Sequence, residues 1–202
     1  MRKVIYISYK AICVITFAFF NKLFYWGLLL KLFLLNIPHG KIETGSGIIK
    51  IRVGHHGRIE IGDYVNFANR WEVGYPVKCF LRVNGLLKIG NHTGMNSTMI
   101  FCDDKIEIGN NVLIGGGTII FDTNFHNTNY LERRDPKFNG KSKTAPISIG
   151  NDVFIGGHCI ICKGVNIGPR SMVAAGSVVV NSIPADELWG GNPAKFIKKI
   201  NR

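Results

Sequence analysis

Among the residues that could do chemistry, His126 is the most suggestive, because it lies in a polar stretch, residues 123–144, that interrupts a regular chain. Histidine can act as a general base or acid near neutral pH, since its unperturbed pKa is about 6.5. Asp122, four residues upstream, suits either orienting an imidazole or capping a turn. Loops that leave a rigid framework often carry function, although a solvated loop histidine needs no role.

Two neighbouring carboxylates, Asp103 and Asp104, are a second candidate for chemistry. Paired carboxylates hydrogen-bond well to ligand hydroxyls, but aspartate is equally favoured at turns. Three further histidines, His55, His56 and His92, fit no pattern of partners. The carboxylate pair is therefore compatible with ligand binding or with a turn.

The cysteines do not indicate a disulfide framework, since their number is odd and their spacing irregular. They are Cys13, Cys79, Cys102, Cys159 and Cys162. Cys159 and Cys162 form a single CxxC, which we interpret as packing thiols rather than zinc ligands. We therefore expect a reducing compartment and no metal.

The framework around these residues repeats every six positions. Aliphatic residues recur at Ile149, Ile155, Ile161, Ile167, Val173 and Val179. This period fits neither a helix nor an alternating strand, and it is typical of parallel β-helices. The chain is therefore predicted to be all-β, with a solenoid over residues 39–184 and an ejected loop at about 123–144.

The two ends of the chain differ from the solenoid. Residues 1–38 contain five Lys or Arg and no acidic residue, and their uncharged runs are too short to span a bilayer. We predict an apolar helical segment that lies on an anionic membrane surface or packs on the solenoid or in an oligomer. Residues 185–202 are predicted to be a connector and a short helix over 194–200, with Pro193 at its first position.

The chain of 202 residues has a formal net charge of +12. Such an excess favours anionic partners, which include phosphate-bearing small molecules, anionic lipid and nucleic acid. No helix-turn-helix or zinc-finger pattern is present, so no nucleic acid is expected.

Three stretches carry a resemblance to a known family: the repeats, DTNFH at 122–126, and GGNPAKFIKKI at 190–200. Over roughly residues 60–202 the chain resembles left-handed β-helix acyltransferases of the hexapeptide-repeat superfamily. It is most similar to the galactoside/maltose/xenobiotic acetyltransferase branch and to surface-polysaccharide O-acetyltransferases. The resemblance implies a left-handed parallel β-helix, a homotrimer with active sites between subunits, and acetyl-CoA as the donor.

The resemblance also implies roles for individual residues. His126 would be the catalytic base, with Asp122 beside it, and the backbone N–H of Gly157 would stabilise the oxyanion. The acceptor would be bound by Asn96, Asp103 and Asp104. The remaining donor-site residues would be Gly115, Ala175, Lys195 and Lys198. The chain departs from the family pattern at Val180 and Asn181, where Thr-Lys is common.

The expected reaction is transfer of an acetyl group from acetyl-CoA to a sugar hydroxyl, with a surface-polysaccharide precursor, free or lipid-linked, as acceptor. N-acetylation of an amino sugar, acylation of an antibiotic and a non-catalytic scaffold remain alternatives. A γ-class carbonic anhydrase shares this type of fold, but no close histidine pair lies within the regular repeats. The expected location is the cytoplasm, free or on the inner face of the cell membrane.

Overall fold

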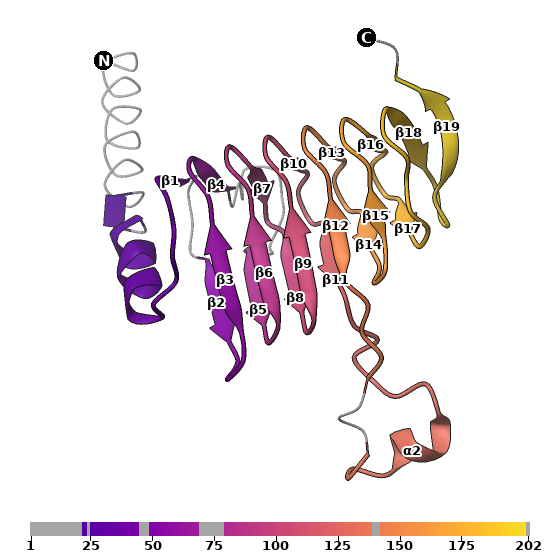
Figure 1. Cartoon of the computed structure of the whole chain (residues 1–202), viewed down its shortest axis with the longest axis horizontal. Helices are drawn as coiled ribbons and strands as arrows, with labels where there is room; N and C mark the ends of the chain where they lie inside the picture. The colour runs from indigo at the N-terminus through magenta and orange to yellow at the C-terminus, as the bar shows by residue number, and fades with distance from the viewer. Residues whose placement is uncertain (1–21, 24, 45–48, 69–78, 139–141, 201–202) are drawn as a thin grey trace, which may run out of the picture.

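The computed structural model describes residues 22–23, 25–44, 49–68, 79–138 and 142–200. Its strands wind into one solenoid, in which successive coils stack side by side along the long axis (Figure 1). Each full coil contributes one strand to each of three sheets, A, B and C, in the order C, A, B. All strand pairs are parallel except the last, β18 with β19, so the predicted parallel β-helix is confirmed.

Sheet A has five strands: β3 (Arg58–Ile61), β6 (Leu86–Ile89), β9 (Lys105–Ile108), β12 (Ile147–Ile149) and β15 (Asn166–Ile167). Sheet B has eight: β1 (Ile42–Thr44), β4 (Val65–Ala68), β7 (Gly94–Asn96), β10 (Leu113–Ile114), β13 (Phe154–Ile155), β16 (Met172–Val173), β18 (Glu187–Gly190) and β19 (Lys195–Lys199). Sheet C has six: β2 (Lys50–Val53), β5 (Phe80–Val83), β8 (Met99–Cys102), β11 (Ile119–Phe121), β14 (Ile160–Ile161) and β17 (Val178–Val179).

The six-residue period determines which side chains form the core. The predicted aliphatic residues from Ile149 to Val179 are all at most 2% exposed. The parallel register stacks them on equivalent residues of the next coil, as Ile120 stacks on Ile161 and Ile161 on Val179. Each coil therefore buries its apolar side chains only by stacking on its neighbours, which is the source of stability in a solenoid.

The ejected loop leaves the coil directly after β11. Thr123 and Thr144 form an antiparallel bridge at its base, where the Thr123 and Ser142 hydroxyls lie 2.8 Å apart. The loop extends away from the solenoid (Figure 1) and contains a short helix, α2 (Tyr130–Arg134), which has no buried residue. The Asn129 side chain caps α2 by accepting the Leu131 N–H. The loop is thus tied to the coil at its base.

The predicted C-terminal helix is wrong. Residues 195–199 form β19, which pairs antiparallel with β18, Lys195 opposite Gly190 and Lys199 opposite Glu187. A helix of seven residues is marginal in water. The open edge of β18 instead offers hydrogen-bond partners along its length, and this tertiary context overrides local propensity.

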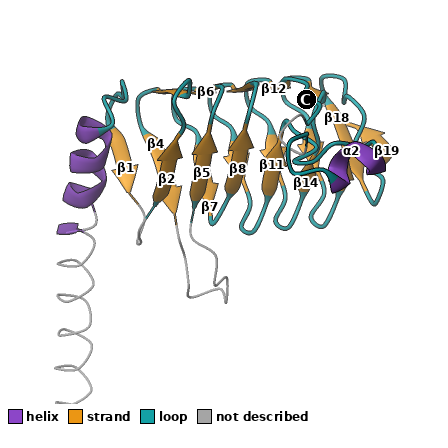
Figure 2. Ribbon diagram, turned by 90° about the horizontal axis from the view of Figure 1, so that it is seen from below, coloured by secondary structure: helices purple, strands orange, loops and turns teal. Residues whose placement is uncertain are grey.

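A helix packs at the N-terminal end of the solenoid (Figure 2). Residues 25–34 are helical, and the helix ends where Asn36 adopts a left-handed conformation with φ of 50°. Ile37 N–H donates to the Leu32 carbonyl and Asn36 N–H to that of Phe33, which is a Schellman motif. The rest of the predicted N-terminal segment, residues 1–21 and 24, lies outside the described residues. Within the described part of the chain, no helix combines the length and apolarity needed to cross a bilayer.

Candidate active site

The predicted site residues fall into two groups at opposite edges of sheet C. Where sheet B leads into sheet C lie Asn96, Gly115, Gly157 and Ala175. Where sheet C leads toward sheet A lie Asp103, Asp104, Asp122 and the loop that carries His126. A strand of three residues, about 10 Å long, separates the two edges. A single chain therefore does not bring His126 to the predicted donor residues.

The first group adjoins a pocket of about 420 Å³ on the outer face of sheet B. Its lining includes the predicted residues Asn96 and Gly115. It also includes Asn66, whose Oδ1 is buried and has no hydrogen-bond partner among the described residues. The Asn96 Oδ1 accepts the Ser97 hydroxyl at 3.2 Å. Two amides on adjacent strands can together bind ligand hydroxyls.

The pocket also has an apolar side. The rings of Tyr64 and His92 stack with centroids 4.9 Å apart and planes 6° apart, and the exposed side chains of Leu113 and Phe154 line the pocket with them. An aromatic surface beside amides suits the mixed polar and apolar faces of a sugar ring. No local pattern in the sequence could identify Tyr64, Asn66 and His92, because their proximity depends on the β4–β7 register.

The predicted donor residues stack on successive coils. A Cβ added to Gly115 would lie 2.4 Å from the Gly157 nitrogen, and one added to Gly156 would lie 2.5 Å from the Ala175 nitrogen. Glycine is therefore required at this corner because the coils stack there backbone against backbone, with no room for a side chain.

The two predicted lysines of the donor site are exposed on β19. Lys195 lies opposite Gly190, which continues the glycine-lined corner because its added Cβ would lie 2.9 Å from the Ala174 Cβ. Lys198 lies opposite Leu188, nearer the start of β18. Of the two, Lys195 is thus closer to the corner.

The second group is built around an ion pair. Arg82 Nη2 donates to both Asp103 carboxylate oxygens at 3.0 and 3.1 Å, and Asn84 donates to Asp103 Oδ1 at 2.7 Å. The Asp103 carboxylate is therefore already engaged within the chain, whereas Asp104 is exposed. Of the predicted pair, Asp104 is the one open to an acceptor.

Asp122 is fully buried and caps the turn between β8 and β9. Its Oδ1 accepts the Asp103 N–H at 2.7 Å and its Oδ2 accepts the Asp104 N–H at 2.9 Å. Burial raises the pKa of Asp122, and these two hydrogen bonds partly oppose the rise. Asp122 was expected either to orient an imidazole or to cap a turn, and these hydrogen bonds are those of a turn cap.

Replacing Asp122 with asparagine is expected to destabilise the fold by about 1–3 kcal/mol, because the amide NH₂ cannot accept and leaves one buried N–H unpaired. Chemical denaturation of Asp122→Asn measures this loss. Asp104→Asn, which alters an exposed carboxylate in the same turn, is the control and should unfold like the parent protein. Equal stability of Asp122→Asn and the control would contradict the capping role.

An aromatic cluster anchors the base of the ejected loop. The Phe125 ring lies 5.3 Å from both Phe101 and Phe121, on the outer face of sheet C. The Arg82 guanidinium lies over the Phe101 and Phe125 rings, at 5.2 and 5.5 Å. The next residue, His126, is exposed, and its N–H donates to the Asn124 carbonyl. Phe125 thus fixes where His126 leaves the coil.

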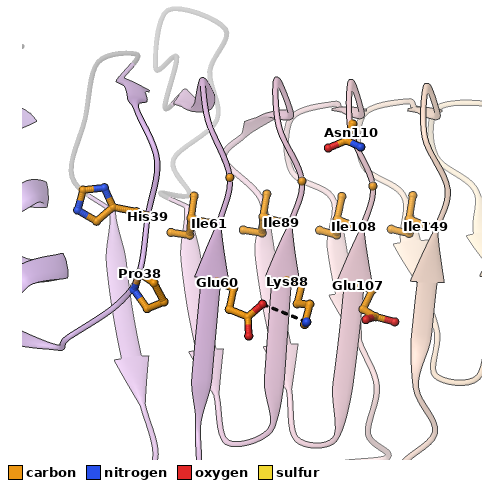
Figure 3. Close-up of a pocket in the computed structure, with 13 residues that line it drawn as sticks. Pro38, His39, Glu60, Ile61, Lys88, Ile89, Glu107, Ile108, Asn110 and Ile149 are labelled. Carbon is orange, nitrogen blue, oxygen red and sulfur yellow. Dashed lines mark ion pairs between the residues drawn. The ribbon is translucent and has the colours of Figure 1, made fainter.

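A larger pocket, of about 720 Å³, lies at the corner between sheets A and B (Figure 3). Glu60 and Lys88 form an ion pair of 3.1 Å along it, next to Glu107. None of the predicted site residues lines this pocket. The charged side chains that line it are largely exposed, as on any solvated face of a sheet. The larger volume of this pocket therefore does not identify it as the active site.

The cysteines have the predicted packing role where they are described. Burial raises the pKa of Cys159 and Cys162, which opposes formation of a reactive thiolate. Among the described residues, no group of three His, Cys, Asp or Glu side chains could hold a metal ion. A hydratase site with three histidine ligands is thus not formed by this part of the chain.

These coils and their glycine-lined corner define a β-helix of the hexapeptide-repeat class. The sequence model described as the hexapeptide repeat of succinyl-transferase matches residues 146–180. A hexapeptide-repeat acetyltransferase of Vibrio cholerae, solved with acetyl coenzyme A, superposes with a TM-score of 0.57 and 28% identity, covering 81% of this chain and 70% of that one. The predicted left-handed parallel β-helix is confirmed.

Similar sequences agree with this class. Galactoside O-acetyltransferase of Escherichia coli is 36% identical over 116 residues, which are 57% of this chain and 55% of the relative. A putative acetyltransferase of Saccharomyces cerevisiae is 41% identical over 113 residues, 55% of each chain. The chain thus spans just over half the length of the curated relatives it matches. Together these similarities support a relationship to the hexapeptide-repeat acetyltransferase superfamily.

Proposed function

We propose that this protein transfers an acetyl group from acetyl-CoA to a hydroxyl of a sugar. The observation that carries the proposal is the sheet B pocket, which places paired amides and an aromatic surface beside the glycine-lined corner. A similar solved structure contains acetyl coenzyme A, and a similar sequence is a galactoside O-acetyltransferase. Acceptor and donor would therefore meet near Asn96 and Gly115.

The complete site would form between chains of a homotrimer. His126 and the pocket lie on opposite edges of sheet C, and the ejected loop extends away from its own solenoid. The loop exposes the apolar side chains of Tyr130, Leu131 and Phe138, which a neighbouring chain would cover. In a cyclic trimer, the loop of one chain would bring His126 to the pocket of the next.

The reaction would need one residue to exchange a proton and one to stabilise the oxyanion. His126 would take the hydroxyl proton as the oxygen attacks the thioester carbon. The Gly157 N–H would donate to the oxyanion of the tetrahedral intermediate. Collapse of the intermediate would break the carbon–sulfur bond and leave the acetyl ester, and His126 would return the proton to the CoA thiolate.

Within this proposal, the acceptor is a surface-polysaccharide precursor, free or linked to a lipid. The excess positive charge favours an acceptor that carries phosphate. A cytoplasmic location would fit the use of acetyl-CoA and the thiols of Cys102, Cys159 and Cys162, which form no disulfide. N-acetylation would use the same base and donor site with an amine acceptor, while a scaffold would bind no donor.

Calorimetric titration with acetyl-CoA tests the proposal first. We expect saturable binding near one site per chain, followed by release of CoA thiol when a pyranoside is added. A pyranoside and its 2-amino-2-deoxy counterpart form a matched pair, and faster release with the amine would assign N-acetylation instead. A folded protein that binds no acetyl-CoA would be a scaffold, and the proposal would be wrong.

A further inference from the structure

The N-terminal helix is apolar on two faces, and the described part of its own chain buries one of them. Leu28 and Leu32, one turn apart, are buried in the solenoid core. The side chains of the other face remain exposed: Trp26 by 65%, Leu30 by 58%, Phe33 by 78% and Leu34 by 71%. A helix that is apolar all round is normally buried, so this second face indicates a missing apolar partner.

Positive charge is concentrated in the N-terminal part of the sequence. Residues 1–58 contain nine Lys or Arg and one acidic residue, Glu43, a net +8 out of the +12 of the whole chain. Lys22 and Lys31 lie on the helix itself, and Lys50 and Arg52 lie on β2 in the first coil. Two lysines therefore lie on the same helix as the exposed apolar face, while the first coil carries both cations and the carboxylates of Glu60 and Asp63.

From these two properties we infer that the helix lies in the interface of an anionic lipid bilayer, with the face formed by Trp26, Phe33 and Leu34 inserted. An apolar stripe flanked by lysines is the pattern of an interfacial helix, and anionic headgroups attract the cations. A protein partner is less well matched, because lysine is depleted from protein interfaces. The lysine stems can extend along the apolar face and place their ammonium groups among the phosphates.

The inference gives the solenoid an orientation. The helix packs at the end of the solenoid, beside the first strands of each sheet (Figures 1 and 2). The sheet B pocket begins on β4, the strand next to β1, so it would lie close to the lipid surface. A pocket close to the lipid surface would favour a lipid-linked acceptor, and this consequence rests on the proposed function. Lipid binding by the helix does not depend on the proposed function.

Vesicle flotation of the full chain tests the inference without any activity assay. We expect binding to phosphatidylcholine vesicles that contain phosphatidylglycerol, little binding to phosphatidylcholine alone, and weaker binding as salt increases. Replacing Phe33 and Leu34 with serine should lower partitioning by about tenfold for each substitution. Val180→Ser, which alters an exposed aliphatic side chain after β17, far from the helix, is the control and should bind like the parent protein.

Trp26 gives a second measurement that does not depend on a destabilising change. Brominated lipids should quench tryptophan fluorescence in the parent protein, and the quenching should largely disappear in Trp26→Phe. Failure of the parent protein to float, or equal flotation of Phe33→Ser/Leu34→Ser, would overturn the inference. Dissociation of an oligomer by the serine pair, with no lipid binding by the parent protein, would assign the face to a second copy instead.

Discussion

Replacing His126 with alanine is expected to lower kcat for acetyl transfer by about 10²–10⁴-fold, because the acceptor hydroxyl would lose its general base. Acetyl-CoA affinity and thermal stability should remain those of the parent protein, since the exposed imidazole lies outside the donor corner and the core. Steady-state release of CoA thiol, combined with calorimetry, separates the two effects. His55→Ala, at an exposed histidine of the first coil, is the control. Unchanged kcat in His126→Ala would remove this residue from the mechanism.

The same variant can test whether the site forms between chains. His126→Ala and Asn96→Ala should each be inactive alone, but mixed trimers should contain sites with His126 from one chain and Asn96 from the next. Random mixing in equal amounts would restore about one quarter of the sites in a cyclic trimer. If both residues act within one chain, no mixture regains activity, because every chain lacks one of them.

Replacing Gly115 with alanine is expected to destabilise the protein by about 1–3 kcal/mol or more, because overpacking forces the backbone to move. The added Cβ would lie 2.4 Å from the Gly157 nitrogen and 2.7 Å from the Gly156 carbonyl carbon, so no side-chain rotation can relieve the overlap. Separation of the two coils should also weaken acetyl-CoA binding. Chemical denaturation and calorimetry measure the two losses.

Gly94→Ala is the matched control for Gly115→Ala. Gly94 also lies on sheet B, but its added Cβ would meet only the Leu113 Cδ2 atom, at 3.3 Å, which is the end of a flexible side chain. Its stability should therefore stay within about 0.5 kcal/mol of the parent protein. Equal stability of the two variants would mean that the coils at Gly115 are not closely stacked.

The fold could be predicted from the sequence because the solenoid expresses its period in every coil. From Ile149 to Val179, each sixth residue is buried for the same reason, namely that it points into the core of a six-residue rung. The first coils vary more, since His55 and His56 lie in a longer connection between β2 and β3. Their period is correspondingly weaker in the sequence, and the predicted position Val73 lies outside the described residues.

The rest depended on contacts that no local pattern encodes. Asn66 and Asn96 line one pocket only because β4 pairs with β7, which places Asn66 opposite Gly94, 28 residues further along the chain. The cap formed by Asp122 joins two coils, so its partners could not be identified from spacing. The C-terminal residues carry a helix-compatible sequence, and only the edge of β18 makes them a strand.

The antiparallel pairing of β19 also affects whether a further strand can be added at the end of sheet B. A stack of parallel coils could in principle continue indefinitely, because each last coil offers its backbone groups to another. At one end of sheet B, β19 reverses direction and presents Lys195, Lys198 and Lys199 at the outer edge. At the other end stands the helix that buries Leu28 and Leu32. A copy that lost residues 187–202 would leave the edge of β16 unpaired, so we expect the C-terminal strand to protect the solenoid against end-to-end association.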